Sequence, residues 1–396
     1  MNQNTNTLRN ISVLHLPSPP APWKTSEWYA SPIAGVPFLL RNVLSLQRSG
    51  IHDLIVYIDN EEIEQLASVI KEDSRVTAKI HWVSNSEQLK ETLQNQKSRI
   101  LLFNGSALHD KKETRSLLKT LVQQETASPI SMDQLESLIE KIQRNDEKEL
   151  IEEQTPSFTY IPGSATARVQ EQRDFSIQHE RLLAGSGQNH DSLITRLLSR
   201  SVSQKMTRLL LNTSVTPNQI TLFSFVTGLV SAIFFAGGTY PLNVFGGFSL
   251  LFSTWLDGTD GEIARLKFME SELGAKLDII CDNIVHFFVF GAIGWGVAKI
   301  TGDETYLYLG GLAAFASLAS FILLGVTILK KNSGATAPAP DAEPSLAEKL
   351  ANRDFINFLM LMALIDQLNI FILISAIGAT VFNIYLAYLR LTQESK

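Results

Sequence analysis

The sequence is short of cysteine and of net positive charge, and each shortage excludes a class of protein. Cys281 is the only cysteine among 396 residues, so no disulfide can form within one chain. The formal net charge is -6 at pH 7, which leaves no face-wide excess of Lys and Arg to neutralise the phosphates of a duplex. We therefore expect no nucleic-acid partner.

Apolar runs are missing from the first half of the chain. The opening residues, Met-Asn-Gln-Asn-Thr-Asn-Thr, lack the apolar core of a signal peptide, and charged residues crowd the chain up to about residue 210. From Ile220 onward, long apolar runs dominate. We predict a soluble part that stays in the cytosol, followed by a membrane part.

The soluble part has the alternating pattern of an α/β domain. Short runs rich in β-branched residues alternate with helical patterns such as the one over 37–49. The runs are Ile11–Leu16, Leu54–Ile58, Ile80–Val83 and Ile100–Phe103. From 107 to about 187 the pattern is charged and helical with few strong apolar stripes, and Gly185-Ser-Gly-Gln-Asn is typical of a linker. We predict a soluble α/β domain over 1–187.

The segment 188–214 is predicted to contain an amphipathic helix. Between Asp191 and Leu211, apolar residues at helical spacing are interleaved with basic ones, among them Arg200, Lys205 and Arg208. Such a helix suits a membrane surface, with its basic side toward anionic headgroups or a phosphorylated substrate. A soluble helix packed on the α/β domain would show the same pattern.

Six apolar segments in 215–396 are candidates for transmembrane helices, because a span needs about 20 mostly apolar residues. They are Gln219–Gly237, Leu242–Leu266, Leu273–Ile300, Tyr306–Leu329, Phe355–Ile365 with its flanks, and Ile370–Leu391. The turns 238–241, 301–305 and 366–369 contain no Lys or Arg, whereas the opposite ends are basic. By the positive-inside rule both termini face the cytosol, and we expect a multi-pass protein of a cell's inner or plasma membrane.

Four aspartates stand where the second and third segments meet. Asp257 and Asp260 are three residues apart, and Asp278 and Asp282 are four apart, so each pair shares one face of a helix. A helical hairpin can bring all four carboxylates together, and their repulsion beside hydrocarbon then requires positive charge. Oxygen ligands favour Mg²⁺ or Mn²⁺, and two such ions can neutralise a diphosphate and polarise its phosphorus. The pattern predicts a phosphoryl-transfer site.

Two other interpretations of the aspartates are open. They could form salt bridges with Arg265, Lys267 and Lys276, which would account for one or two of the carboxylates but not for four. They could also line an ion pathway, because intramembrane acids mark transporters too. Against a pathway, the acids cluster at the ends of two helices.

The motif DxxDGxxAR, followed by eight residues and GxxxDxxxD, resembles the signature of the CDP-alcohol phosphatidyltransferases, and all eight specified positions agree. The resemblance implies a six-helix membrane fold, two metal ions held by the four aspartates, and Asp282 as general base. An acceptor hydroxyl would attack the donor phosphorus and release CMP, in phospholipid or polyol-phosphate synthesis. It also implies a homodimer. The residues expected around the cytidine diphosphate are Gly261, Ala264, Arg265 and Gly274, with Asn218 and Thr221 nearby.

A second set of basic residues has two possible roles. Arg200, Lys205, Arg208 and Arg353 could bind the phosphate of an acceptor, or they could anchor helix ends to anionic lipid. The sequence favours neither role over the other.

The soluble part resembles the sugar-nucleotidyltransferase fold through Ile33-Ala-Gly-Val-Pro-Phe-Leu-Leu and Leu46-Gln-Arg-Ser-Gly-Ile-His-Asp-Leu-Ile-Val. Prolines replace the glycines of the family's phosphate-binding loop after Leu16, and proline has no backbone N–H to offer. Asn104-Gly-Ser also lacks the family's metal-binding Asp. We therefore expect a degenerate domain that does not turn over CTP.

The order of the two domains is similar to that of the bifunctional inositol-phosphate cytidylyltransferase and di-inositol-phosphate-phosphate synthase enzymes. That similarity leaves the natural alcohol open among inositol-type compounds, lipid alcohols and other polyols. The alternative to an enzyme is a catalytically silent membrane anchor whose soluble domain binds a nucleotide or a partner.

Overall fold

The computed structural model describes residues 10–59, 63–94, 98–122, 130–186, 199–332 and 354–394. Contacts within the chain divide it into two compact units, Met1–Leu182 and Leu183–Lys396. The first is an α/β domain and the second is helical. The predicted fold classes of both parts are therefore confirmed, while the boundaries predicted at 187 and 214 stay predictions.

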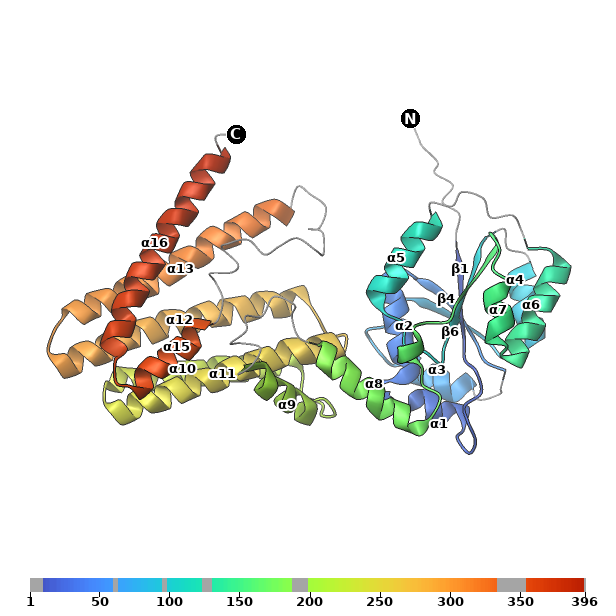
Figure 1. The fold of residues 1–396 in the computed structure, drawn as a ribbon, viewed down its shortest axis with the longest axis horizontal. Helices are drawn as coiled ribbons and strands as arrows, with labels where there is room; N and C mark the ends of the chain where they lie inside the picture. The colour runs from blue at the N-terminus through green and yellow to red at the C-terminus, as the bar shows by residue number, and fades with distance from the viewer. Residues whose placement is uncertain are drawn as a thin grey trace. The chain divides into compact units, whose positions relative to one another are not determined.

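The first unit is built on a five-stranded parallel sheet with the order β5-β4-β1-β6-β7 (Figure 1). The four predicted apolar runs all form strands, and β1, β4 and β6 are buried on both faces of the sheet, as is typical of parallel strands. The fifth, β7, was missed because its four residues do not stand out among charged helices. The strands are β1 (Ile11–His15), β4 (Asp53–Tyr57), β5 (Lys79–Val83), β6 (Ile100–Asn104) and β7 (Phe158–Ile161).

Helices pack on both faces of this sheet through two separate apolar cores. The larger core includes Trp28, Phe38 and Phe103, and the helices that contribute to it are α1 (Thr25–Ala30), α2 (Phe38–Ser49), α3 (Ile63–Lys71), α5 (Lys111–Val122) and α8 (Gln172–Gly185). The other core joins the sheet to α4 (Ser86–Gln94), α6 (Met132–Arg144) and α7 (Glu147–Glu152). Helix α6 buries Leu135, Leu138, Ile139 and Ile142, a stronger apolar stripe than predicted for this stretch. A short antiparallel pair, β2 (Pro32–Ile33) and β3 (Val36–Pro37), precedes α2.

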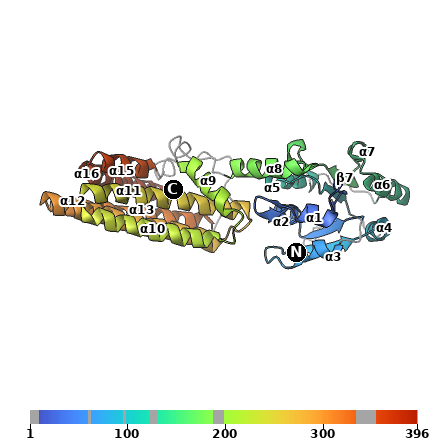
Figure 2. The same ribbon diagram turned by 90° about the horizontal axis from the view of Figure 1, so that it is seen from below.

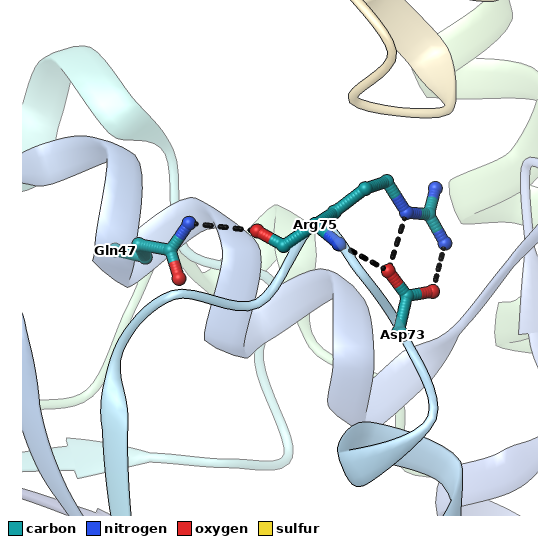
Figure 3. Close-up of polar contacts among 3 residues, drawn as sticks. All are labelled: Gln47, Asp73 and Arg75. Atoms are coloured by element: carbon teal, nitrogen blue, oxygen red, sulfur yellow. Dashed lines mark hydrogen bonds and ion pairs between the residues drawn. The ribbon is translucent and has the colours of Figure 1, made fainter.

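Polar side chains hold the loop between α3 and β5 (Figure 3). Gln47 of α2 donates from Nε2 to the carbonyl oxygen of Arg75 at 3.0 Å, and its Oε1 accepts the backbone N–H groups of Thr77 and Ala78 at 2.7 and 2.9 Å. The Arg75 guanidinium donates to the Asp73 carboxylate and lowers the pKa of that group. Gln47, which lies in a segment that resembles the nucleotidyltransferases, therefore has a structural role here.

All six predicted apolar segments of the second unit form helices, preceded by a helix in the predicted interfacial segment. The helices are α9 (Arg200–Leu210), α10 (Pro217–Gly237), α11 (Tyr240–Leu266), α12 (Glu272–Thr301), α13 (Thr305–Asn332), α15 (Asp354–Leu364) and α16 (Leu368–Glu394). Within the described part of the chain, four of them are long and apolar enough to cross a membrane, namely α10, α12, α13 and α16. Helix α11 carries four charged side chains and α15 has 11 residues, so six spans stay a prediction.

Small residues bring the helices of this unit close together. Figures 1 and 2 both show α10, α11 and α12 side by side. A Cβ atom added to Gly294 of α12 would lie 2.6 Å from the Cα of Gly310 in α13, and one added to Gly296 would overlap the carbonyl oxygen of Phe235 in α10. Such contacts between backbones are possible only where side chains are absent.

Replacing Gly296 by Ala should destabilise this unit. The added methyl group meets backbone rather than a flexible side chain, and forcing α10 and α12 apart costs about 1–3 kcal/mol or more. We expect a lower melting temperature for the detergent-purified variant. Gly291→Ala on the same helix is the matched control, because nothing lies within 4 Å of its added Cβ, and it should melt at or above the wild-type temperature. Equal melting of the Gly296 variant and the wild type would contradict the close α10–α12 contact.

Candidate active site

Three of the four predicted aspartates converge between α11 and α12. Asp257, Asp278 and Asp282 each offer a carboxylate oxygen, and the three oxygens all lie within 4.8 Å of one another. Asp257 is buried, and the other two are partly buried. Aspartates from both helices therefore meet at one point, as the spacing of the motif predicts for a helical hairpin.

Asp260 is adjacent to this group but has a protein partner. Its side chain is buried, and Oδ2 accepts a hydrogen bond from the Oγ1 hydroxyl of Thr221 in α10. The structure therefore joins three helices at the site, through α10 as well as the α11–α12 hairpin. Whether Asp260 also ligates a metal stays a prediction.

The donor atoms suit a divalent cation. Oδ1 of Asp278 is buried and has no hydrogen-bond partner among the described residues, although an isolated buried carboxylate oxygen is costly. It belongs to a group of three carboxylates whose repulsion a cation would relieve. Oxygen donors of this kind are the ligands that Mg²⁺ and Mn²⁺ prefer. The residues present therefore fit a metal of this class.

Several predicted nucleotide-site residues lie beside the hairpin. Asn218, in the first turn of α10, lies against Gly274 of α12, because a Cβ on that glycine would be 3.0 Å from the Asn218 Oδ1. A Cβ on Gly261 would lie 3.2 Å from Nη1 of Arg265, so the guanidinium covers this glycine. Arg265 also donates from Nε to the carbonyl oxygen of Ser186 at 2.8 Å.

Ala264 has a backbone role that is visible in the structure. Its carbonyl oxygen accepts the N–H of Met269 at 2.8 Å, in the turn that follows α11. This bond closes the end of α11 and directs the chain toward α12. The roles of Ala264 and the other small residues toward a nucleotide stay predictions.

The predicted acceptor residues on α9 are less closely tied to the aspartates. Ser203 and Thr207 are buried on the side of α9 that faces α11, whereas Lys205 and Arg208 are exposed. Arg200 donates from Nη2 to the carbonyl oxygen of Ala184 at 3.0 Å. Arg353 lies outside the described residues. The acceptor-binding role of all four stays a prediction.

Sequence reasoning missed Glu262, which lies inside the aspartate motif. Its side chain is buried and accepts hydrogen bonds from the hydroxyl groups of Ser203 and Thr207. The motif leaves this position unspecified, so the family resemblance gave no signal for it. A carboxylate on the helix face opposite the aspartates was the only available signal, and it does not identify the partner.

In the soluble domain, several polar groups bond to one another at the place where a doubly wound sheet binds ligands. This place is the carboxyl end of β1 and β6, where the strand order reverses. There the N–H of Gly105 donates to the His15 carbonyl oxygen at 2.7 Å. Asn104 donates from Nδ2 to Oε1 of Glu147 at 2.6 Å, and Oε2 of Glu147 pairs with Arg168 at 2.8 Å. The loss of a nucleotidyltransferase site in this domain stays a prediction.

Two buried histidines at this edge should make the soluble domain sensitive to acid. Burial lowers the pKa of both His15 and His109 to about 4, from an ordinary value near 6.5. As the pH falls from 6.5 toward 4, the unfolded chain binds protons that the folded domain does not. Each histidine should therefore reduce the free energy of unfolding, by up to about 3 kcal/mol once the pH is below 4.

Denaturant titrations of the full chain between pH 7 and 4 test this expectation, with hydrogen exchange reporting on peptides from the soluble domain. The control is His15→Phe, which keeps a ring to stack on Tyr57 but cannot titrate. Its stability should depend less steeply on pH than that of the wild type. Identical slopes would show that His15 is not held neutral.

Comparison with known proteins relates the helical domain to a family. The model of the CDP-alcohol phosphatidyltransferase family matches residues 214–389. This part of the chain is thus similar to the CDP-alcohol phosphatidyltransferases. This match confirms the resemblance recognised from the aspartate motif. Within the described residues four helices are long and apolar enough to cross a membrane, and together with this match they indicate an integral membrane protein.

Curated relatives of this chain include three proteins named "Bifunctional IPC transferase and DIPP synthase". The one from Archaeoglobus fulgidus is 36% identical over 141 residues, which are 34% of this chain and 27% of that protein. The one from Aquifex aeolicus is 36% identical over 103 residues, 26% and 23% of the two chains. The one from Thermococcus kodakarensis is 27% identical over 224 residues, 56% and 48%. The chain thus spans about a quarter to a half of the length of these relatives.

A solved structure is also similar to this helical domain. It is the Mycobacterium tuberculosis phosphatidylinositol phosphate synthase with CDP-DAG bound, which is 18% identical. The match covers 48% of this chain and 92% of that one, with a TM-score of 0.39.

Proposed function

We propose that this protein transfers a substituted phosphate group from a CDP-alcohol to a hydroxyl acceptor and releases CMP. The observation that carries the proposal is the convergence of Asp257, Asp278 and Asp282 within a domain similar to the CDP-alcohol phosphatidyltransferases. The reaction forms a bond between the acceptor oxygen and the donor phosphorus and breaks the bond from that phosphorus to the CMP oxygen.

Different side chains have different roles in this proposed transfer. Asp257, Asp260, Asp278 and Asp282 would hold two Mg²⁺ or Mn²⁺ ions, which would neutralise the diphosphate and polarise the phosphorus. Asp282 takes the proton of the acceptor hydroxyl as general base. The Thr221 hydroxyl orients Asp260 through their hydrogen bond.

The nucleotide would lie where the helices leave room for it. Gly261 and Gly274 bring backbone rather than side chains to the start of the hairpin, and Arg265 covers Gly261 with a positive charge suited to a diphosphate. Asn218 lies against Gly274 and is in reach of the same region. In this arrangement all six apolar helices cross the membrane, both termini are cytosolic, and the site opens to the cytosol.

The substrates are proposed to be of the inositol class. Relatives named phosphatidylinositol phosphate synthase and "Bifunctional IPC transferase and DIPP synthase" support an inositol-containing donor or acceptor. The soluble domain is proposed not to supply the donor, because prolines replace the glycines of the phosphate-binding loop that it resembles. Arg200, Lys205, Arg208 and Arg353 are proposed to bind the acceptor phosphate, and a homodimer is the proposed assembly.

Purified full-length protein tests the proposal directly. With Mn²⁺ or Mg²⁺, and with inositol phosphate, inositol or glycerol phosphate as acceptor, CMP should be released from one member of a donor panel that includes CDP-inositol, CDP-DAG and CDP-glycerol. CTP with inositol phosphate should not be consumed. Absence of CMP release from every pair would overturn the proposal, and cation flux into vesicles without any CDP compound would favour a transporter.

A second candidate is a silent anchor whose soluble domain binds a nucleotide or a partner. The contacts between polar groups at the carboxyl edge of its sheet favour a domain without catalysis. The two candidates differ in their dependence on metal. Binding by a silent anchor would survive chelation of divalent cations, whereas CMP release would not.

A further inference from the structure

Glu262 forms hydrogen bonds that link α9 to α11, the helix that carries Asp257 and Asp260. Its carboxylate is 3% exposed, and both of its oxygens accept hydrogen bonds. The Ser203 hydroxyl donates to Oε1 at 3.0 Å, and the Thr207 hydroxyl donates to Oε2 at 2.6 Å. Both donors are buried and lie one turn apart on α9, so one carboxylate bridges two successive turns of the neighbouring helix.

This carboxylate lies on the far side of α11 from Asp257, Asp260, Asp278 and Asp282, which we call the metal cage because they are proposed to hold the metal ions. At about 100° per residue, Glu262 is about 140° around the helix axis from Asp257 and about 160° from Asp260. It therefore cannot join the cage as a ligand. Its side of α11 is instead covered by α9, because a Cβ on Gly258 would lie 3.4 Å from the Cβ of Ser203.

Apolar contacts complete the same interface. Leu256 and Ile263 of α11 form a cluster with Ile220, and Met206 and Leu210 of α9 pack against it. These contacts bury area but tolerate sliding, because apolar attraction has no direction. Two hydrogen bonds to one buried carboxylate are directional, and breaking them leaves a buried charge without partners. Glu262 therefore opposes rotation of α11 from the α9 side, while hydrogen bonds of Ser253 and Asp260 to α10 oppose it from the other side.

We propose that Glu262 is a positioning residue for the metal cage. With Ser203 and Thr207, it fixes the rotation of α11 and so the direction in which Asp257 and Asp260 point toward Asp278 and Asp282. The link to catalysis rests on the proposed function. The property that Glu262 directly affects is the affinity of the cage for a divalent cation. That affinity can be measured without turnover.

Titration of the full-length protein with Mn²⁺, followed by electron paramagnetic resonance of the free ion, measures this affinity. Glu262→Leu should weaken Mn²⁺ binding about 10- to 100-fold, the range for lost supports of metal ligands. Glu262→Gln keeps one carbonyl oxygen to accept a hydroxyl and should lose less. Glu304→Gln, at an exposed glutamate in the turn between α12 and α13, is the control and should bind as the wild type does.

Thr207→Val keeps the inference testable if the Glu262 variants do not fold. Valine has nearly the same shape as threonine and removes only the donor to Oε2. We expect a several-fold weaker Mn²⁺ affinity and a correspondingly higher Mn²⁺ requirement for CMP release, with the KM for the CDP-alcohol little changed at saturating metal. Wild-type Mn²⁺ affinity in folded Thr207→Val and Glu262→Gln would overturn the inference.

The outcomes separate this inference from the proposed function. A wild-type protein that binds Mn²⁺ but releases CMP from no donor would overturn the proposed function, while the variants would still report on the cage. Conversely, active protein with unchanged Mn²⁺ affinity in every Glu262 and Thr207 variant would overturn the positioning role alone.

Discussion

Asp282→Asn is expected to reduce CMP release by a factor on the order of 10³ or more while leaving the protein folded. Asparagine has nearly the same size, but it cannot accept a proton from the acceptor hydroxyl, and it removes one charge from the three-carboxylate group. The loss should appear in kcat measured at saturating donor and metal. Melting temperature and elution volume in detergent should stay close to the wild-type values.

The control for this variant is Glu304→Gln, which removes a carboxylate from an exposed position far along the chain from the motif. It should retain wild-type turnover. If Asp282→Asn turns over within about threefold of the wild type, the residue is neither base nor essential ligand, and the assignment of the site is wrong.

Removal of divalent cations should abolish CMP release completely, and Mn²⁺ or Mg²⁺ should restore it. Three carboxylate oxygens within 4.8 Å of one another repel when no cation is present, so the charge balance needed for a diphosphate is lost together with the ion. The measurement is turnover after treatment with a chelator, followed by titration with each metal.

The matched variant for the metal experiment is Asp278→Asn, because Oδ1 of Asp278 is the buried oxygen without a partner among the described residues. It should raise the concentration of metal needed for half-maximal activity by tenfold or more, if any activity remains. Full turnover in excess chelator would contradict a metal-dependent transfer and favour the silent-anchor or transporter alternatives.

The positions of the helices and strands followed from patterns that are local in the sequence. Apolar length predicted α10, α12, α13 and α16, and alternation of apolar runs with helical patterns predicted four of the five strands. Strand β7 was missed because four residues carry too little pattern, and α6 was underestimated because its apolar stripe lies among charged side chains.

The features of the site that depend only on neighbouring residues were predictable from the sequence. Spacings of three and four residues put each aspartate pair on one face of a helix, and a short turn keeps the adjoining ends of the two helices near each other. The sequence therefore determined that carboxylates would gather at the α11–α12 hairpin, and the family resemblance named the chemistry. Neither depended on the packing of any third helix.

What only the tertiary structure decided is which groups the acids meet. Asp260 receives its hydrogen bond from Thr221, 39 residues away, and Glu262 receives one from Ser203, 59 residues away. Contacts at such separations depend on how α9 and α10 rotate and slide against α11, and helical periodicity fixes the face of a residue without fixing the helix that covers it. The amino-acid sequence placed the acids on their helices, and the packing of those helices selected their partners.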